Sequence, residues 1–227
     1  MKANKQNTAI VIPVYNSEKY LAKLLTKILH FFPKENIFAV DDGSSDKSAE
    51  ICSSYGINLF KFLQNSGKGS ALKKGFEEAI KNNFVFAITL DSDLQHDPDK
   101  IPDFIKKQNE KESDLVIGKR NFSLTKMPLH RICSNTLTSF IVSLVTGYRV
   151  FDSQSGYRLY NLNLIGRLNF VSQKYQFETE IILKFAKLKA RIDFIEIETI
   201  YSGQKSYISH FRDIMNFIKI VIHEMRN

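Results

Sequence analysis

The chain has 227 residues, which is enough for one large domain or for a domain with a small appendage. Its hydrophobic share of 43% and charged share of 25% are ordinary for a globular protein, and its net charge of +8 favours an anionic partner such as a nucleotide or an acidic membrane surface. Long blocks of like charge are missing, so a nucleic-acid partner is not expected, and the two cysteines lack metal or redox spacing. We expect neither a signal peptide nor a membrane-spanning run of about 18 apolar residues.

Short apolar runs alternate with amphipathic stretches through the first half of the chain. Strands are predicted at residues 9–14, 37–40, 57–63, 84–90 and 114–118. Helices are predicted between them from apolar residues at helical spacing, with Ser17 as the N-cap of the first and Asp97 as the cap of the helix that follows residue 90. This alternation predicts an α/β fold with a mainly parallel sheet and helices on both faces.

The second half is less regular. Helices are predicted near residues 137–145 and 177–188, and one or two strands within 191–201. A polar loop is expected at 147–158, and residues 214–225 form an amphipathic helix with a basic side. Because no repeat or flexible linker is visible, we predict a single domain over 1–227, divided into halves of about 8–120 and 121–227.

Acidic clusters follow two of the predicted strands, as Asp41-Asp42 and as Asp91-Ser92-Asp93. Carboxylates one residue apart can turn towards one divalent cation, and oxygen ligands suit Mg²⁺ or Mn²⁺. A calcium loop is excluded, because His96 and Pro102 stand where it needs glycine and glutamate. A solvated turn is the alternative. Ligands bind at the carboxyl ends of parallel strands, and turns have no reason to be acidic at each of these ends, so a site is favoured.

The segment 65–70, Asn-Ser-Gly-Lys-Gly-Ser, resembles part of a P-loop. The P-loop motif requires glycine at position 62, where this chain has Phe62, so a P-loop is excluded. The segment is either a glycine-rich helix start or a loop whose amides and Lys68 face an anion. Arg120 and Arg158 are candidate phosphate-binding forks, although a lone arginine is more often a surface residue.

Together these segments resemble family 2 glycosyltransferases of the GT-A fold, and most closely the branch of polyprenyl-phosphate sugar synthases that includes dolichyl-phosphate mannose synthase. The resemblance extends from about residue 8 to the last helix, and its specificity comes from six weak motifs in the right order. They are Ile12-Pro13-Val14-Tyr15-Asn16, Val40-Asp41-Asp42-Gly43-Ser44-Ser45-Asp46, Asn65-Ser66-Gly67-Lys68-Gly69, Asp91-Ser92-Asp93-Leu94-Gln95-His96, Gly118-Lys119-Arg120 and Ser155-Gly156-Tyr157-Arg158.

The resemblance implies roles for individual residues. The nucleotide sugar would contact Pro13, Tyr15, Val40, Asp42, Lys68, Asp91, Ser92 and Arg120. Asp91 and Asp93 would be the DxD metal ligands, with Gln95 as a candidate third. Arg131 and Arg158 would meet the acceptor phosphate, and the catalytic residues would be Asp93, Arg120 and Asp152.

Two positions depart from the family pattern. Ser209-His210 falls where relatives often have Ser-Lys near the donor diphosphate, which puts that contact in doubt. Ser17 stands where the mannose synthases have glutamate, with Glu18 adjacent. The match to the mannose enzymes is therefore looser than the match to the branch.

The implied chemistry is a direct displacement that inverts the anomeric centre, in which a cation, Lys68 and the arginines neutralise the leaving diphosphate. A phosphate acceptor is already an anion, whereas a hydroxyl acceptor needs a base, for which Asp152, Glu178 and Glu180 are candidates. We therefore predict a metal-dependent inverting glycosyltransferase that uses a UDP- or GDP-sugar and polyprenyl (dolichyl or undecaprenyl) phosphate.

The predicted location is peripheral, on the cytoplasmic face of the membrane. The C-terminal helix and the helix after Arg131 would rest on lipid, with core packing as the alternative for both. A homo-oligomer or a membrane partner subunit is compatible with this prediction. The competing functions are a family 2 enzyme that glycosylates a hydroxyl of a glycan or glycolipid, and a non-catalytic nucleotide-sugar-binding subunit.

Overall fold

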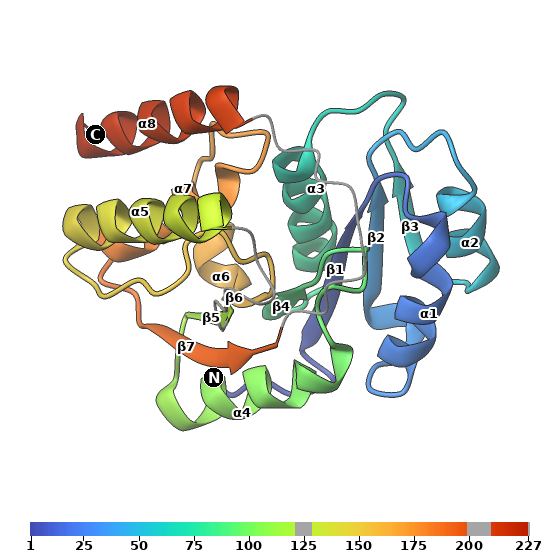
Figure 1. Cartoon of the computed structure of the whole chain (residues 1–227). Coiled ribbons are helices and arrows are strands. Elements are labelled where there is room, and N and C mark those ends of the chain that lie inside the picture. Colours follow the sequence, from blue (N-terminus) through green and yellow to red (C-terminus); the bar gives the residue numbers. More distant parts are fainter. Residues whose placement is uncertain (121–128, 199–209, 227) are drawn as a thin grey trace.

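Seven strands form one sheet in the computed structural model, which describes residues 1–120, 129–198 and 210–226 (Figure 1). The strands are β1 Thr8–Val14, β2 Ile37–Asp41, β3 Asn58–Lys61, β4 Phe86–Thr89, β5 Leu115–Arg120, β6 Arg158–Asn161 and β7 Ile192–Ile197. Their order is β3-β2-β1-β4-β6-β5-β7. In this sheet β6 runs antiparallel to β4 and β5, and the other described pairs are parallel. The prediction of a mainly parallel α/β fold is confirmed.

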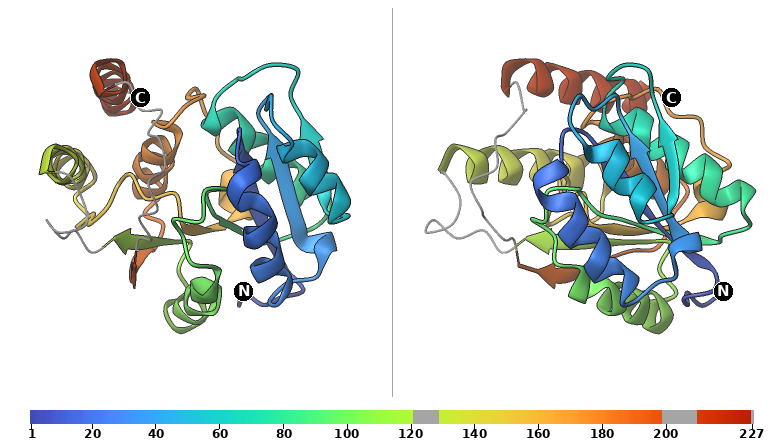
Figure 2. Two further views of the ribbon diagram at one scale, coloured as in Figure 1. Left: turned by 45° about the vertical axis from the view of Figure 1, so that its right-hand side comes forward. Right: turned by 90° about the vertical axis from the view of Figure 1, so that its right-hand side faces the viewer.

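Helices cover both faces of the sheet (Figures 1 and 2). They are α1 Glu18–Leu29, α2 Ser48–Ser54, α3 Lys68–Lys81, α4 Ile101–Lys111, α5 Leu129–Thr146, α6 Leu162–Ile165, α7 Phe177–Lys187 and α8 His210–Arg226, with 3-10 turns η1 Lys34–Asn36 and η2 Pro98–Lys100. One apolar cluster joins α1, α2 and α4 to one face of the sheet. A second cluster joins α3, α5, α6, α7 and α8 to the other face.

Strand β1 shows how the sequence builds these two layers. Successive strand residues point to opposite faces, so Ile12 belongs to the cluster under α1 while Val11 belongs to the cluster under α3. Both side chains are fully buried. Gly75 of α3 faces Val11 so closely that a Cβ at this position would collide with the valine side chain. Glycine therefore sets the distance between α3 and the sheet.

Strand β6 is the main difference from the sequence-based expectation. The sequence predicts a polar loop that ends at Arg158, whereas in the structure Arg158 begins a strand that inserts between β4 and β5 by pairing with both. Such pairing joins residues far apart in the chain and leaves no local pattern in a four-residue segment. Asp97 accepts a hydrogen bond from the Asp99 amide (3.3 Å) and caps η2, the turn before α4, as predicted.

Helices α5 and α8 form the outermost layer on one side of the molecule, and both pack against α7 (Figures 1 and 2). Glu224 of α8 is buried and forms ion pairs of 2.8 Å with Lys184 and Lys187 of α7. These pairs fix α8 by charge as well as by apolar packing. No helix in the described part of the chain is long and apolar enough to cross a bilayer.

Candidate functional site

The carboxyl ends of four strands converge at one edge of the sheet. Tyr15 follows β1, Asp42 follows β2, Asp91 comes two residues after β4, and Arg120 ends β5. Since β1, β2, β4 and β5 run in the same direction, these side chains project from the same edge. The motifs predicted from the sequence are therefore brought together by the parallel part of the sheet.

Asp42 links the end of β2 to the segment that precedes α3. Its carboxylate accepts hydrogen bonds from the amides of Ser66 (2.7 Å) and Gly67 (2.9 Å), and the residue is buried. Burial raises the pKa of Asp42, and these two bonds oppose the rise. Gly67 has a φ of +98°, which glycine adopts without strain. Asp42 thus shapes the loop before Lys68, and its contact with a base or ribose stays a prediction.

Asp91 and Asp93 experience opposite electrostatic environments. Burial would raise the pKa of Asp91, but the Lys68 ammonium, 2.6 Å from Asp91 Oδ1, outweighs it and lowers the pKa to about 2. Burial and the Asp91 charge raise the pKa of Asp93 to about 6. A divalent cation beside both carboxylates would relieve this repulsion. The electrostatics of the pair therefore fit the predicted metal site.

The neighbours of this pair hold it in place. Gln95 donates to both Asp93 oxygens, from its amide N–H (3.0 Å) and from Nε2 (2.8 Å). In this arrangement Gln95 orients Asp93, and its role as a third metal ligand stays a prediction. His96 Nδ1 accepts from the Asp91 amide (3.3 Å), and burial lowers the His96 pKa to about 4, so the ring is neutral at pH 7.

Ser92 lies 2.6 Å from Ser17, measured between the two hydroxyl oxygens, and both residues are buried. Ser17 occupies the N-cap position of α1, as predicted, although its side chain makes no cap hydrogen bond. Its hydroxyl instead bonds Ser92 and the Tyr15 carbonyl (3.1 Å), and joins the ends of β1 and β4. The sequence contained no signal for this contact.

Lys68 lies between two carboxylates, because its ammonium is also 2.9 Å from Glu178 Oε1. Burial would lower the pKa of Lys68, but Asp91 and Glu178 outweigh that effect and raise it, so the amine stays charged. Gly156 lies against this trio, and a Cβ there would fall 2.6 Å from Lys68 Nζ and 2.9 Å from Asp91 Oδ2 and Glu178 Oε1. The sequence suggests Glu178 as a candidate base and gives no sign of this pairing.

Arg120 and Asp152 form a two-pronged ion pair. Arg120 Nε lies 2.7 Å from Asp152 Oδ2, and Nη2 lies 2.9 Å from Oδ1. Asp152 is fully buried and also accepts from the Arg120 and Gln154 amides (3.3 and 3.2 Å). A carboxylate held in this way positions a guanidinium and cannot approach an acceptor as a base. The structure thus corrects the predicted catalytic role of Asp152.

Arg158 lies in the core, contrary to its predicted contact with the acceptor. Its side chain has no exposed surface, and its guanidinium donates to the carbonyls of Ser155 (2.6 Å), Glu178 (2.7 Å) and Ser153 (2.8 Å). Glu180 is also fully buried, where it accepts two backbone N–H bonds of 2.8 and 2.9 Å. Both residues therefore have structural roles.

The residues predicted to hold the base separate into two groups. Pro13 and Val40 face each other across β1 and β2 and are buried, so the Val40 side chain cannot reach a nucleotide as predicted. Tyr15 is 37% exposed at the site edge and remains a candidate. Arg131 and Ser209-His210 lie outside the residues whose side chains the structure describes.

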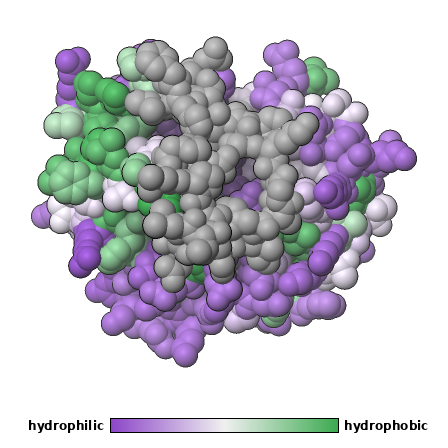
Figure 3. All heavy atoms as spheres, in the orientation of Figure 1, coloured by the Kyte–Doolittle hydropathy of each residue, from purple (hydrophilic) through white to green (hydrophobic). Residues whose placement is uncertain are grey.

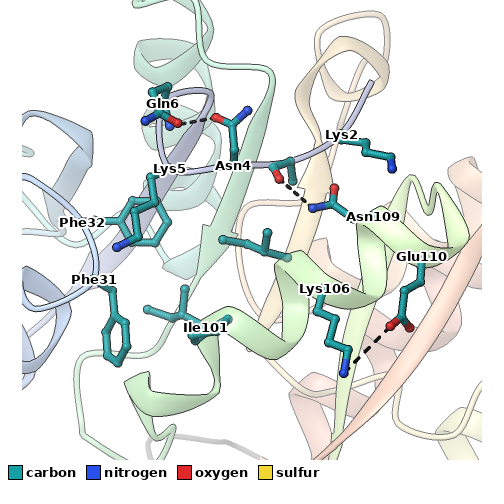
Figure 4. Close-up of a pocket in the computed structure, with 13 residues that line it drawn as sticks. Lys2, Asn4, Lys5, Gln6, Phe31, Phe32, Ile101, Lys106, Asn109 and Glu110 are labelled. Carbon is teal, nitrogen blue, oxygen red and sulfur yellow. Dashed lines mark hydrogen bonds and ion pairs between the residues drawn. The ribbon is translucent and has the colours of Figure 1, made fainter.

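A pocket of about 800 Å³ lies away from this site (Figure 4). It is formed by the N-terminal segment before β1, by Phe31 and Phe32 after α1, and by α4. Lys2, Lys5 and Lys106 lie around it, and Lys106 pairs with Glu110 at 4.0 Å. None of the predicted site residues lines this pocket. Because residues 2–6 precede β1, the pocket lies at the amino end of that strand and not at the site.

The sequence matches the model of the family described as Glycosyl transferase family 2 over residues 9–168. It is 34% identical to a protein of unassigned function from Methanocaldococcus jannaschii, over 88% of this chain and 84% of that protein. It is 30% identical to the UDP-N-acetylglucosamine–dolichyl-phosphate N-acetylglucosaminyltransferase of Methanococcus voltae, over 85% of each chain. It is also 27% identical to the undecaprenyl-phosphate 4-deoxy-4-formamido-L-arabinose transferase of Pectobacterium carotovorum, over 88% of this chain and 62% of that protein.

The fold is that of solved GT-A structures. Glucosyl-3-phosphoglycerate synthase from Mycobacterium tuberculosis, in complex with Mn²⁺, UDP-glucose and phosphoglyceric acid, superposes with a TM-score of 0.79 over 96% of this chain and 79% of that one, at 16% identity. The family match covers more than half of the chain, and the fold and the ordered motifs agree with it. The chain therefore belongs to glycosyl transferase family 2 and is a glycosyltransferase.

Proposed function

We propose that this glycosyltransferase moves a sugar, with inversion, from a nucleotide-sugar donor to polyprenyl phosphate at a membrane surface. The choice of acceptor rests on the contacts that already hold the three candidate bases. Asp152 is locked to Arg120, Glu178 to Lys68, and Glu180 to backbone amides. A hydroxyl acceptor needs a base, whereas a phosphate acceptor is already a nucleophilic anion. The phosphate is thus the acceptor that this set of residues suits.

The relatives support the same choice. The Methanococcus voltae protein is named for transfer to dolichyl phosphate, and the Pectobacterium protein for transfer to undecaprenyl phosphate. Both names describe an acceptor that is a phosphate on a polyprenyl chain. The first also names a UDP-sugar donor, and we extend that donor class to this chain.

The proposal includes a divalent cation, Mg²⁺ or Mn²⁺, held by Asp91 and Asp93. Among the described residues no three His, Cys, Asp or Glu side chains converge as a metal site. Two carboxylates from the chain, completed by diphosphate oxygens and water, are the usual environment of Mg²⁺ beside a nucleotide. When bound, the cation would neutralise charge on the leaving diphosphate. Lys68 and Arg120 would bind the same anionic group from their own sides of the site.

Transfer assays test the function directly. The protein is incubated with radiolabelled UDP- or GDP-sugars and Mn²⁺, and with either polyprenyl phosphate or a membrane glycan. We expect label in the lipid phosphate fraction. Label on the glycan alone would assign a hydroxyl acceptor, and nucleotide binding without transfer from any donor would identify a non-catalytic subunit.

Replacing Asp152 with Asn is expected to lower transfer by about tenfold to a hundredfold, because one prong of the Arg120 pair becomes a repulsive N–H contact. The loss should appear mainly in the KM for the donor if Arg120 binds its phosphate or sugar. Arg120→Lys, which keeps the charge but not the fork, should act in the same direction. Asp103→Asn, at an exposed pair with Lys100, is the control. An unchanged donor KM in both site variants would contradict the role of Arg120.

A second element of the proposal is the surface that meets lipid. Apolar side chains on the outer faces of α5 and α8 are between 40% and 67% exposed; they are Leu137, Phe140, Leu144, Met215, Ile218, Ile222 and Met225. Figure 3 shows hydrophobic residues gathered on the side of the molecule where Figure 1 places these helices. Lys219 and Arg226 are exposed on α8. Apolar residues flanked by basic ones are typical of helices that lie on an anionic bilayer.

Replacing Phe140 and Ile222 together with Glu is expected to reduce binding to vesicles of anionic phospholipid by tenfold or more, since two apolar groups are lost and two like charges are added. Vesicle sedimentation measures the effect. Leu63→Glu, at a fully exposed position after β3 on the opposite edge of the sheet, is the control. Transfer to a short water-soluble prenyl phosphate should be unchanged in the double variant. Equal vesicle binding by all three proteins would rule out this surface.

A further inference from the structure

The ion cluster around Lys68 has a feature that the proposed function does not explain. Lys68 Nζ lies 2.6 Å from Asp91 Oδ1, so one of the two proposed cation ligands already carries a positive partner. Glu178, nearly fully buried at the start of α7, lies 2.9 Å from the same ammonium. A cation that binds Asp91 therefore meets a resident ammonium.

The cluster is built with almost no free space on the side of Gly156. A Cβ at this residue would come within 2.9 Å of all three charged groups. Arg158 fixes both flanks of the cluster, because it donates to the Ser155 carbonyl beside Gly156 and to the Glu178 carbonyl. Lys68 itself begins α3, behind a loop that Asp42 holds through Ser66 and Gly67. The positions of Lys68 and Glu178 are therefore set by the fold.

The charges of the trio decide how it responds to ligands. Asp91 and Glu178 together carry two negative charges against the single positive charge of Lys68. An arriving divalent cation attracts the carboxylates and repels the ammonium at a few ångströms, and a diphosphate attracts the ammonium. Glu178 is buried and its carbonyl accepts a hydrogen bond from Arg158, so we expect it to stay in place and to retain Lys68 within reach of both ligands.

We propose that Lys68 is the resident counter-charge of the cation site: it competes with the divalent cation for Asp91 and turns to the donor diphosphate once the cation has entered, while Glu178 is the positioning residue that keeps it there. This inference rests on the proposed function for the identity of the donor. It goes further in giving Lys68 opposite effects on the two ligands and in giving Glu178 a role other than that of a base.

Binding of Mn²⁺ alone, measured by calorimetry, tests the competition. Lys68→Met should bind Mn²⁺ about tenfold more tightly than the wild type, because a like charge is removed. Glu178→Gln should bind Mn²⁺ about tenfold more weakly, because an anion is lost and Lys68 then pairs with Asp91 alone. In the Lys68→Met background, Glu178→Gln should weaken Mn²⁺ binding less than it does in the wild type, because the part of its effect that acts through Lys68 is gone. General damage to the fold would weaken binding in every variant, so tighter binding by Lys68→Met distinguishes competition from damage.

Binding of UDP and of GDP in saturating Mn²⁺ tests the second half. Lys68→Met should lose about tenfold or more in affinity for the nucleotide that the wild type binds, the opposite sign to its effect on the metal. Lys68→Arg, which keeps the charge, should retain Mn²⁺ affinity near that of the wild type. Lys74→Met and Glu78→Gln are matched controls, since that pair lies on the same helix at 2.8 Å and makes the same charge changes.

The outcomes separate this inference from the proposed function. Unchanged or weaker Mn²⁺ binding by Lys68→Met would overturn the competition even if transfer to polyprenyl phosphate is found. Opposite-sign effects on metal and nucleotide would support it even if the acceptor proves to be a hydroxyl. A wild-type protein that binds no Mn²⁺ would remove the basis of the inference.

Discussion

Asp93→Asn is expected to reduce metal-supported transfer by about 10³-fold, because the variant keeps the shape of the side chain but loses one of the two anionic ligands of the cation. Asp93 is placed for this role by its position two residues after Asp91 and by the two hydrogen bonds from Gln95. Steady-state transfer in Mn²⁺ and in Mg²⁺ measures the effect. Asp97→Asn, on the same loop but paired with Lys27 at 2.9 Å, is the control and should retain activity.

The same substitution should stabilise the metal-free protein. The pKa of Asp93 is raised from 3.8 to about 6, so its ionisation is disfavoured in the folded chain. Its contribution to stability is complete below the unfolded value and is lost as the pH rises through about 6. At pH 7 a neutral Asn avoids this cost, which is about 1–2 kcal/mol after allowance for partial exposure. Thermal unfolding should therefore show a midpoint a few degrees higher for Asp93→Asn.

The pH dependence provides a second measurement on the same residue. Cation binding requires the ionised carboxylate, so Mn²⁺ affinity of the wild type should fall as the pH drops through about 6. Asp91, with a pKa near 2, should not contribute to the pH dependence in this range. Full activity in Asp93→Asn would contradict a metal-ligand role. So would a Mn²⁺ affinity that does not change as the pH crosses the Asp93 pKa of about 6.

The sequence predicted the parts of the fold that depend on local pattern. The strands that precede Asp42 and Asp91 follow from apolar runs, and the shared edge of their carboxyl ends follows from parallel pairing. It did not predict β6, whose four residues owe their conformation to β4 and β5 on either side. Non-local pairing of this kind is set by the tertiary structure, which a local periodicity does not record.

The site shows the same division. The spacing of Asp91 and Asp93 marks them as candidate metal ligands, whereas the sequence suggests for Glu178 and Asp152 only a generic role as bases. Their partners in the structure, Lys68 and Arg120, are distant in sequence. The identity of an acidic residue does not tell whether it acts as a base or as a counter-ion. Contacts across the sheet edge decide between these roles, and they appear only once the chain is folded.

Arg158 is the second residue for which we expect a large effect. Its guanidinium donates the hydrogen bonds that the carbonyls of Ser153, Ser155 and Glu178 would otherwise receive from water, and the side chain has no solvent exposure. Arg158→Met would leave these carbonyls without their donor, at a cost of about 3–5 kcal/mol. For a chain of this size, that loss corresponds to a midpoint of thermal unfolding lower by about 10 °C or more. Circular dichroism melts measure it.

The same three carbonyls explain why activity should fall together with stability. Ser153 follows Asp152, which orients Arg120, while Ser155 and Glu178 flank the Lys68 cluster. Arg158 therefore connects the two ion pairs of the site through the backbone. Arg158→Lys should have a melting midpoint between those of the wild type and Arg158→Met, since one ammonium cannot reach all the positions of a planar guanidinium. Arg167→Met, at an exposed position after α6, is the control and should melt like the wild type. If Arg158 instead contacted an acceptor phosphate, Arg158→Met would raise the KM for the acceptor and leave the melting midpoint unchanged.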